Sequence, residues 1–208
     1  MDLDDVPPQG AAPSGHRLVD AAAGLCALII SVVSLWVAIT NGHTNKQLVA
    51  ANSWPFLQLM NQNDDEQGNL IIKLAVQNAG VGPAKVKTFE VFWDDQPMKG
   101  SVELLRACCG YQMTGFGPET QNSSRPMVPS TSIVAGNVIR AGESIKMLSL
   151  PLGEDNKVVW HRLDAARFKM RFRACYCSVF DECWISDLAA LTPKPVRACM
   201  VPIVAYQE

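Results

Sequence analysis

Residues 21–42 of this chain read AAAGLCALIISVVSLWVAITNG, a run of 22 positions without a charged side chain. The hydrocarbon core of a bilayer is about 30 Å thick, so at 1.5 Å per residue a helix needs roughly 20 apolar residues to cross it. A cleavable signal peptide instead has an apolar region of about 7–15 residues with a cleavage site close behind it. The sequence therefore predicts one membrane-spanning helix over residues 20–42 that is retained as an anchor.

The predicted helix separates segments of different composition. Residues 1–19 are rich in Pro, Gly, Ala and Asp, and such a segment buries too little apolar surface to offset the entropy lost on ordering. We expect a disordered tail over residues 1–19, a short stalk over 43–54 and a folded domain over 55–208. That domain is long enough to enclose one hydrophobic core.

Beyond the span the charges nearly cancel. Four of the 20 acidic residues and one of the 18 basic residues come before residue 21, which leaves 16 acidic and 17 basic residues after it. Domains that bind nucleic acid or a lipid surface usually carry clustered basic residues, so we expect no nucleic-acid partner. Arg17 and Lys46 flank the span on opposite sides, so charge does not set its orientation.

Six of the seven cysteines follow the span, and Cys26 lies within it. An even set of cysteines suits an oxidising compartment, where disulfides persist, although six unrelated buried thiols in a reducing cytosol remain the alternative. A hairpin that turns at residues 179–181 would place Cys177 opposite Cys183, within reach of a disulfide. We therefore expect that disulfide, a domain outside the cytoplasm and a cytoplasmic tail. The pairing of the other four stays open: Cys108, Cys109, Cys175 and Cys199.

Most of residues 55–208 follow the period of two that is typical of half-buried strands. The clearest case is 70–77, and further strands are expected at 56–60, 86–93, 133–139, 145–150, 168–177, 184–188 and 196–206. Short helices are expected over 101–109, with Ser101 as N-cap and Gly110 as terminator, and over 155–166. Seven or eight short strands without regularly intervening helices predict a mainly β domain, a β-sandwich with one or two short helices.

The segment Asn78-Ala79-Gly80-Val81-Gly82-Pro83-Ala84 separates two of these predicted strands. It is interpreted as a structural turn, since a phosphate-binding loop would continue into a lysine and a helix. Together with the nearby span and a late hairpin that contains Tyr176, Ser178 and Trp184, the segment resembles a class of uncharacterised bacterial single-pass membrane proteins with an immunoglobulin-like β-sandwich. The resemblance implies that fold, a bacterial inner-membrane location and a periplasmic domain, and it implies no catalytic residue.

Two surfaces are candidates for contact with a partner. The first is one face of the span, where small residues recur every three or four positions and allow another helix to approach closely, unless the helix simply faces lipid. The second is the long loop 111–132, because loops of more than about 12–15 residues often bind other molecules. The candidate residues are Ala23, Ala27, Ser31, Ser34 and Ala38 on the helix, and Tyr111, Met113 and Phe116 in the loop.

Residue patterns for catalysis or metal binding are weak. The sequence contains neither a Gly-x-Ser-x-Gly nor a Cys-x-x-Cys motif, and the basic stripe Lys169, Arg171 and Arg173 is interpreted as an ordinary exposed strand face. We expect no cofactor and a membrane-anchored, non-enzymatic interaction module that binds a membrane protein or a second copy of itself, as an accessory or assembly subunit of a larger complex. The alternatives are a thiol-redox enzyme that uses the domain cysteines and a periplasmic ligand sensor.

Overall fold

The structure is a computed structural model that describes residues 15–112 and 129–207. The chain divides into two compact units, residues 1–49 and 50–208. Helix α1 runs from Gly15 to Asn52, and among the described residues it is the one helix long and apolar enough to cross a membrane. It starts before the predicted boundary at residue 20 and continues through the predicted stalk. Good helix formers such as Arg17, Gln47 and Leu48 allow this, because each added residue after nucleation costs little.

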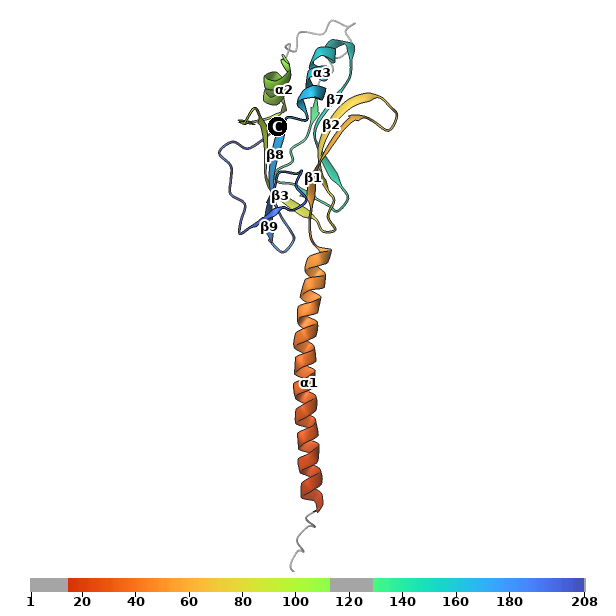
Figure 1. Cartoon of the computed structure of the whole chain (residues 1–208), viewed down its shortest axis with the longest axis vertical. Helices are drawn as coiled ribbons and strands as arrows, with labels where there is room; N and C mark the ends of the chain where they lie inside the picture. Colours follow the sequence, from red (N-terminus) through yellow and green to blue (C-terminus); the bar gives the residue numbers. More distant parts are fainter. Residues whose placement is uncertain (1–14, 113–128, 208) are drawn as a thin grey trace, which may run out of the picture. The chain divides into compact units, whose positions relative to one another are not determined.

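The described residues of the second unit form two antiparallel sheets (Figure 1). The smaller sheet has the order β1-β2-β7-β5, and the larger has the order β10-β9-β8-β3-β4, with β6 paired to the start of β3. The strands of the smaller sheet are β1 (Leu57–Asp64), β2 (Leu70–Asn78), β5 (Ser130–Thr131) and β7 (Ser144–Pro151). Those of the larger are β3 (Ala84–Trp93), β4 (Gln96–Met98), β6 (Val138–Ile139), β8 (Arg171–Cys177), β9 (Cys183–Ser186) and β10 (Lys194–Val196).

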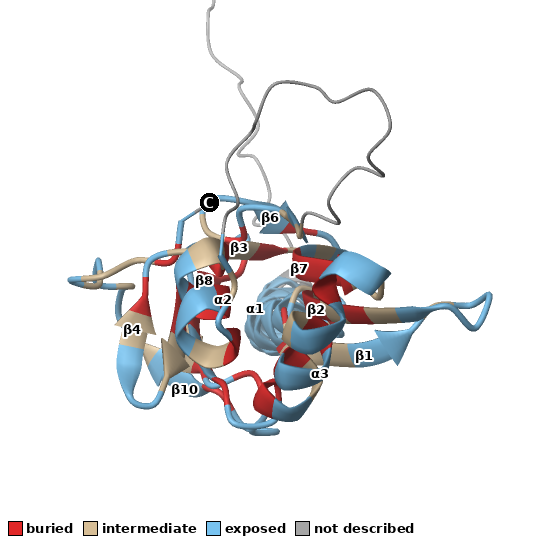
Figure 2. Ribbon diagram, turned by 90° about the horizontal axis from the view of Figure 1, so that it is seen from above, coloured by how far each residue is buried: buried red, intermediate tan, exposed pale blue. Residues whose placement is uncertain are grey.

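The two sheets bury their facing side chains in one hydrophobic core, coloured red in Figure 2. The alternation predicted for residues 70–77 is confirmed at Ile72, Leu74 and Val76, which are fully buried. It does not hold at the ends of the pattern, because Leu70 is exposed and Ala75 is buried as well. The larger sheet contributes residues such as Phe89 and Tyr176 to the same core. Since successive side chains on a strand point to opposite faces, the residues that alternate with these lie on the outer face of the larger sheet.

Both predicted short helices are present and pack against each other. They are α2 (Ser101–Cys109) and α3 (Lys157–Ala166), the latter preceded by the 3₁₀ turn η1 (Glu154–Asn156). Gly110 ends α2 as expected, with a φ of 71°. The prediction of Ser101 as N-cap was wrong, because Gly100 occupies that position and Ser101 is buried in the first turn. The Glu103 carboxylate accepts a hydrogen bond from the Lys99 N–H group instead, at 2.6 Å.

Two of the predicted strands are much shorter than expected. The segment 133–139 contributes only β6, because the chain turns at Gly136, where φ is 79°. The segment 196–206 contributes only the last residue of β10. Beyond β10 the chain is attached to the larger sheet at separate points, so it needs no continuous strand pairing.

Asn78 fastens the segment 53–56, which follows α1, to the rest of the domain. Its side chain is fully buried. The carboxamide oxygen accepts hydrogen bonds from the N–H groups of Phe56 (3.1 Å) and Gly80 (3.0 Å). The carboxamide nitrogen donates to the carbonyl oxygens of Gly82 (2.8 Å) and Ile139 (2.9 Å). All four hydrogen-bonding positions of the amide are therefore used.

The glycines of the same segment allow a close approach of two backbones. A Cβ atom at Gly82 would lie 2.1 Å from the Ser53 carbonyl oxygen, and one at Gly80 would lie 2.4 Å from the Phe56 nitrogen. The Trp54 carbonyl oxygen accepts hydrogen bonds from Val81 and Gly82, at 3.1 and 3.2 Å. The space beside this turn is thus filled by the chain itself, in keeping with a structural role.

Replacing Asn78 with Asp should destabilise the domain by about 3 kcal/mol, because a carboxylate oxygen would then face two buried carbonyl oxygens without a hydrogen to share. Urea denaturation of the detergent-solubilised chain, followed by tryptophan fluorescence, measures the change. Asn63→Asp, on the exposed part of β1, is the matched control and should change stability little. Equal losses in the two variants would contradict this account of Asn78.

Candidate functional site

The outer face of the larger sheet brings charged, aromatic and sulfur-containing side chains together. Strands β3, β8 and β9 are neighbours in this sheet, and residues paired in register point to the same face. The surface therefore continues across three strands. Its central residues are Glu90 and Phe92 on β3, Arg171, Arg173 and Cys175 on β8, and Ile185 on β9.

Carboxylates neutralise the two arginines of this face. Arg173 donates to both oxygens of the buried Glu90 carboxylate, at 2.6 and 2.5 Å, and this hydrogen bonding raises the pKa of Arg173. Arg171 is hydrogen-bonded to Asp95. Both guanidinium groups lie over the ring of Phe92, at 5.7 and 5.4 Å from its centroid. Two of the three residues of the predicted basic stripe, Arg171 and Arg173, are therefore paired with carboxylates.

A groove with a volume of about 700 Å³ lies where β8 begins and β9 ends. We call it the β8–β9 groove. Apolar side chains such as Leu59, Phe168 and Ile185 line it, together with polar groups that include Asp187. Asp187 shapes one wall, because its carboxylate accepts hydrogen bonds from the N–H groups of Ala190 (2.7 Å) and Ala189 (3.0 Å). These backbone hydrogen bonds hold the pKa of Asp187 below its usual value.

The six cysteines that follow α1 form three disulfides in the described part of the chain. One joins Cys177 to Cys183, the pair expected from the hairpin. Another joins Cys175 on β8 to Cys199, 24 residues later. The third joins the neighbours Cys108 and Cys109 at the end of α2. The last two pairings could not be chosen from the sequence.

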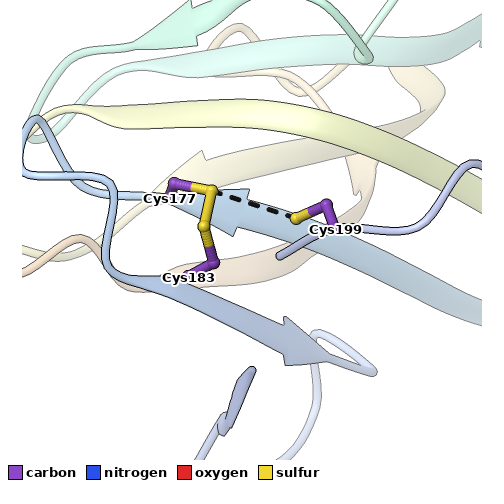
Figure 3. Close-up of side chains that lie close together, drawn as sticks. All are labelled: Cys177, Cys183 and Cys199. Carbon is purple, nitrogen blue, oxygen red and sulfur yellow. Dashed lines mark hydrogen bonds between the residues drawn. A yellow bond between two sulfur atoms is a disulfide. The ribbon is translucent and has the colours of Figure 1, made fainter. Parts of the chain in front are cut away.

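Two of these disulfides lie side by side (Figure 3). The Sγ atoms of Cys177, Cys183 and Cys199 all lie within 4.8 Å of one another, and that of Cys177 is 3.9 Å from that of Cys199. Three thiolates at such spacing could bind a soft metal ion. Here each sulfur is one half of a disulfide, which removes the thiolate that a metal would need.

Residues 199–206, called here the C-terminal strap, connect β8 to β3. At one end Cys199 is bonded to Cys175. At the other end Tyr206 is buried, its N–H group donates to the Phe89 carbonyl oxygen (3.1 Å), and its ring meets Phe89 edge-on at 5.8 Å. Between these attachments Met200, Val201 and Ile203 are 86%, 87% and 105% exposed. This surface is not predictable from the sequence, because an uncharged apolar run next to a cysteine is equally typical of a buried strand.

The surfaces predicted from the sequence have mixed outcomes. Tyr111 is half-buried against the core, and Met113 and Phe116 lie outside the described residues. The small residues of α1 are exposed, and the Ser31 hydroxyl donates to the Ala27 carbonyl oxygen at 2.8 Å within the same helix. That hydroxyl therefore already donates a hydrogen bond within its own helix. The five residues Ala23, Ala27, Ser31, Ser34 and Ala38 still give one face of α1 a row of small side chains.

No model of a protein family matches this chain, and no match is found among curated proteins. The resemblance to single-pass periplasmic proteins therefore stays a prediction.

Asp187→Ala should lower the free energy of unfolding of the domain by no more than about 1 kcal/mol, because the hydrogen bonds of Asp187 lie at the surface. A folded-state pKa below the unfolded value contributes stability above the unfolded pKa of about 3.9, and that contribution is lost as the pH falls through the lower, folded value. The stability difference between wild type and variant should thus be present at pH 7 and shrink toward pH 3. Urea denaturation at both pH values tests this, and a difference that grows at pH 3 would refute it.

Proposed function

We propose that this chain is a membrane-anchored, non-enzymatic interaction module whose two sheets form an immunoglobulin-like sandwich in the bacterial periplasm. Helix α1 supports the anchor, since it is long and apolar enough to span a bilayer. The disulfides support an oxidising compartment. The antiparallel pairing of all the described strands supports a sandwich.

The C-terminal strap is the observation that carries the proposal. Its exposed side chains are large and apolar, and no charged residue occurs from Ala198 to Tyr206. Exposed apolar surface costs free energy in water and marks sites of association. The strap is also attached at both ends, so a partner that covers Met200, Val201 and Ile203 would lose little entropy by ordering it.

The partner that fits this surface is another membrane-bound protein or a second copy of this chain. Confinement to one membrane raises the effective concentration of two anchored proteins, so a small apolar contact suffices for association. The face of α1 formed by Ala23, Ala27, Ser31, Ser34 and Ala38 offers a second, independent contact within the bilayer. Two such contacts are typical of an accessory or assembly subunit of a larger complex.

Copurification from gently solubilised membranes tests the proposal. The wild-type chain should elute as a complex, and Met200→Asp with Ile203→Asp should reduce the recovered complex at least about tenfold, because burying two charges costs more than 1.4 kcal/mol. Val158→Asp, which changes a 64% exposed residue on α3, is the control and should leave the complex intact. Wild-type protein that is recovered alone and monomeric would refute the proposal.

A thiol-redox function is the second candidate, and the disulfide between Cys108 and Cys109 favours it. Cys108 is partly exposed at the end of α2, where an external thiol can reach it. In this function, mild treatment with a dithiol should open the Cys108–Cys109 bond reversibly while the fold persists. Three disulfides that all resist such treatment would exclude this function, as judged by alkylation and mass mapping.

A further inference from the structure

Cys177 lies between two possible partners. Its sulfur is bonded to Cys183 and is 3.9 Å from the sulfur of Cys199, which is itself bonded to Cys175. Cys175 and Cys177 are two residues apart on β8, so both point to the outer face of the larger sheet. Figure 3 shows the Cys199 side chain directed toward Cys177. Cys199 can therefore reach either cysteine of β8 with a small movement of the strap.

We infer that these four cysteines form a thiol–disulfide exchange centre, in which Cys199 transfers between Cys175 and Cys177 when an external thiol opens the hairpin disulfide. This activity goes beyond the proposed interaction function. It depends on the cysteine geometry alone and stands whether or not the strap binds a partner.

The exchange begins at the hairpin disulfide. Cys183 is the more exposed half of that pair, at 8% against 2% for Cys177. An external thiolate attacks the Cys183 sulfur, forms a mixed disulfide with it and breaks its bond to Cys177. The electron pair of the broken bond leaves on Cys177, which becomes a thiolate.

The second step transfers the strap. The Cys177 thiolate attacks the Cys199 sulfur, forms the Cys177–Cys199 bond and breaks the Cys175–Cys199 bond. Cys175 leaves as a thiolate and takes a proton from water. One external thiol has been consumed and one protein thiol released, so the number of disulfides is unchanged and no oxidant is required.

The transfer moves the point of attachment of the strap. Two residues along a strand correspond to about 6–7 Å, so the residue of β8 to which the strap is bonded would lie that much nearer to the tip of the β8–β9 hairpin. Tyr206 keeps its separate attachment to β3. The exposed side chains of Met200, Val201 and Ile203 would thus take different positions relative to β8 in the two disulfide states.

The experiment uses the full-length chain in detergent with Cys26→Ser, which removes the free thiol of α1. Adding Cys183→Ser leaves Cys177 as a thiol beside an intact Cys175–Cys199 bond. After incubation at pH 8, alkylation at acid pH and digestion without reductant, mass spectrometry should find Cys199 linked to Cys175 and to Cys177. We expect the two linkages within about tenfold of each other, because the partners differ little in reach.

Two further samples keep the result interpretable. Cys26→Ser alone, treated with limiting glutathione, should yield the Cys177–Cys199 linkage together with alkylated Cys175, and this tests the exchange without a change in the centre. Cys26→Ser with Cys109→Ser frees Cys108 on α2 instead, and it should retain only the Cys175–Cys199 and Cys177–Cys183 linkages of the centre. General scrambling in this control would refute a local exchange.

The inference is overturned if Cys199 remains linked only to Cys175 while Cys177 is fully alkylated, both in the variant and after glutathione treatment. It is also overturned if untreated protein releases stoichiometric zinc and shows all four cysteines as free thiols. That outcome would assign the cluster to a metal centre.

Discussion

The buried carboxamide of Asn78 holds together segments that are far apart in the sequence. Its hydrogen bonds reach Phe56 before β1, Gly82 before β3 and Ile139 in β6. Strand β1 belongs to the smaller sheet, whereas β3 and β6 belong to the larger. One side chain thus joins the two sheets and the segment that follows α1.

The outer face of the larger sheet differs in character from the core side. Its arginines are paired with Glu90 and Asp95, so these two cations are already neutralised by carboxylates of the same chain. What it offers instead is apolar and sulfur-containing surface, in the β8–β9 groove and along the strap. Recognition at such a face depends on shape and apolar contact, and it would depend little on salt.

Two of the three disulfides lie on this face rather than in the core. The hydrophobic cluster includes residues of both sheets and of both short helices, and it can hold the sheets together without a covalent bond. The Cys177–Cys183 and Cys175–Cys199 bonds instead hold the hairpin and the strap. In the proposed exchange, the change of disulfide would alter this surface and leave the hydrophobic cluster without a broken covalent bond.

Local patterns in the sequence determined the features that depend on neighbouring residues. The long apolar helix α1 follows from an uncharged run, and the burial of β2 follows from alternation. The limits of α2 follow from residues 101–110, and the Cys177–Cys183 pairing follows from a single hairpin. The tertiary structure alone decided the partners of Asn78, the Cys175–Cys199 bond and the exposure of the strap. These depend on which distant strands become neighbours. The order of strands in a sheet is set by the packing of the whole core, which no local pattern encodes.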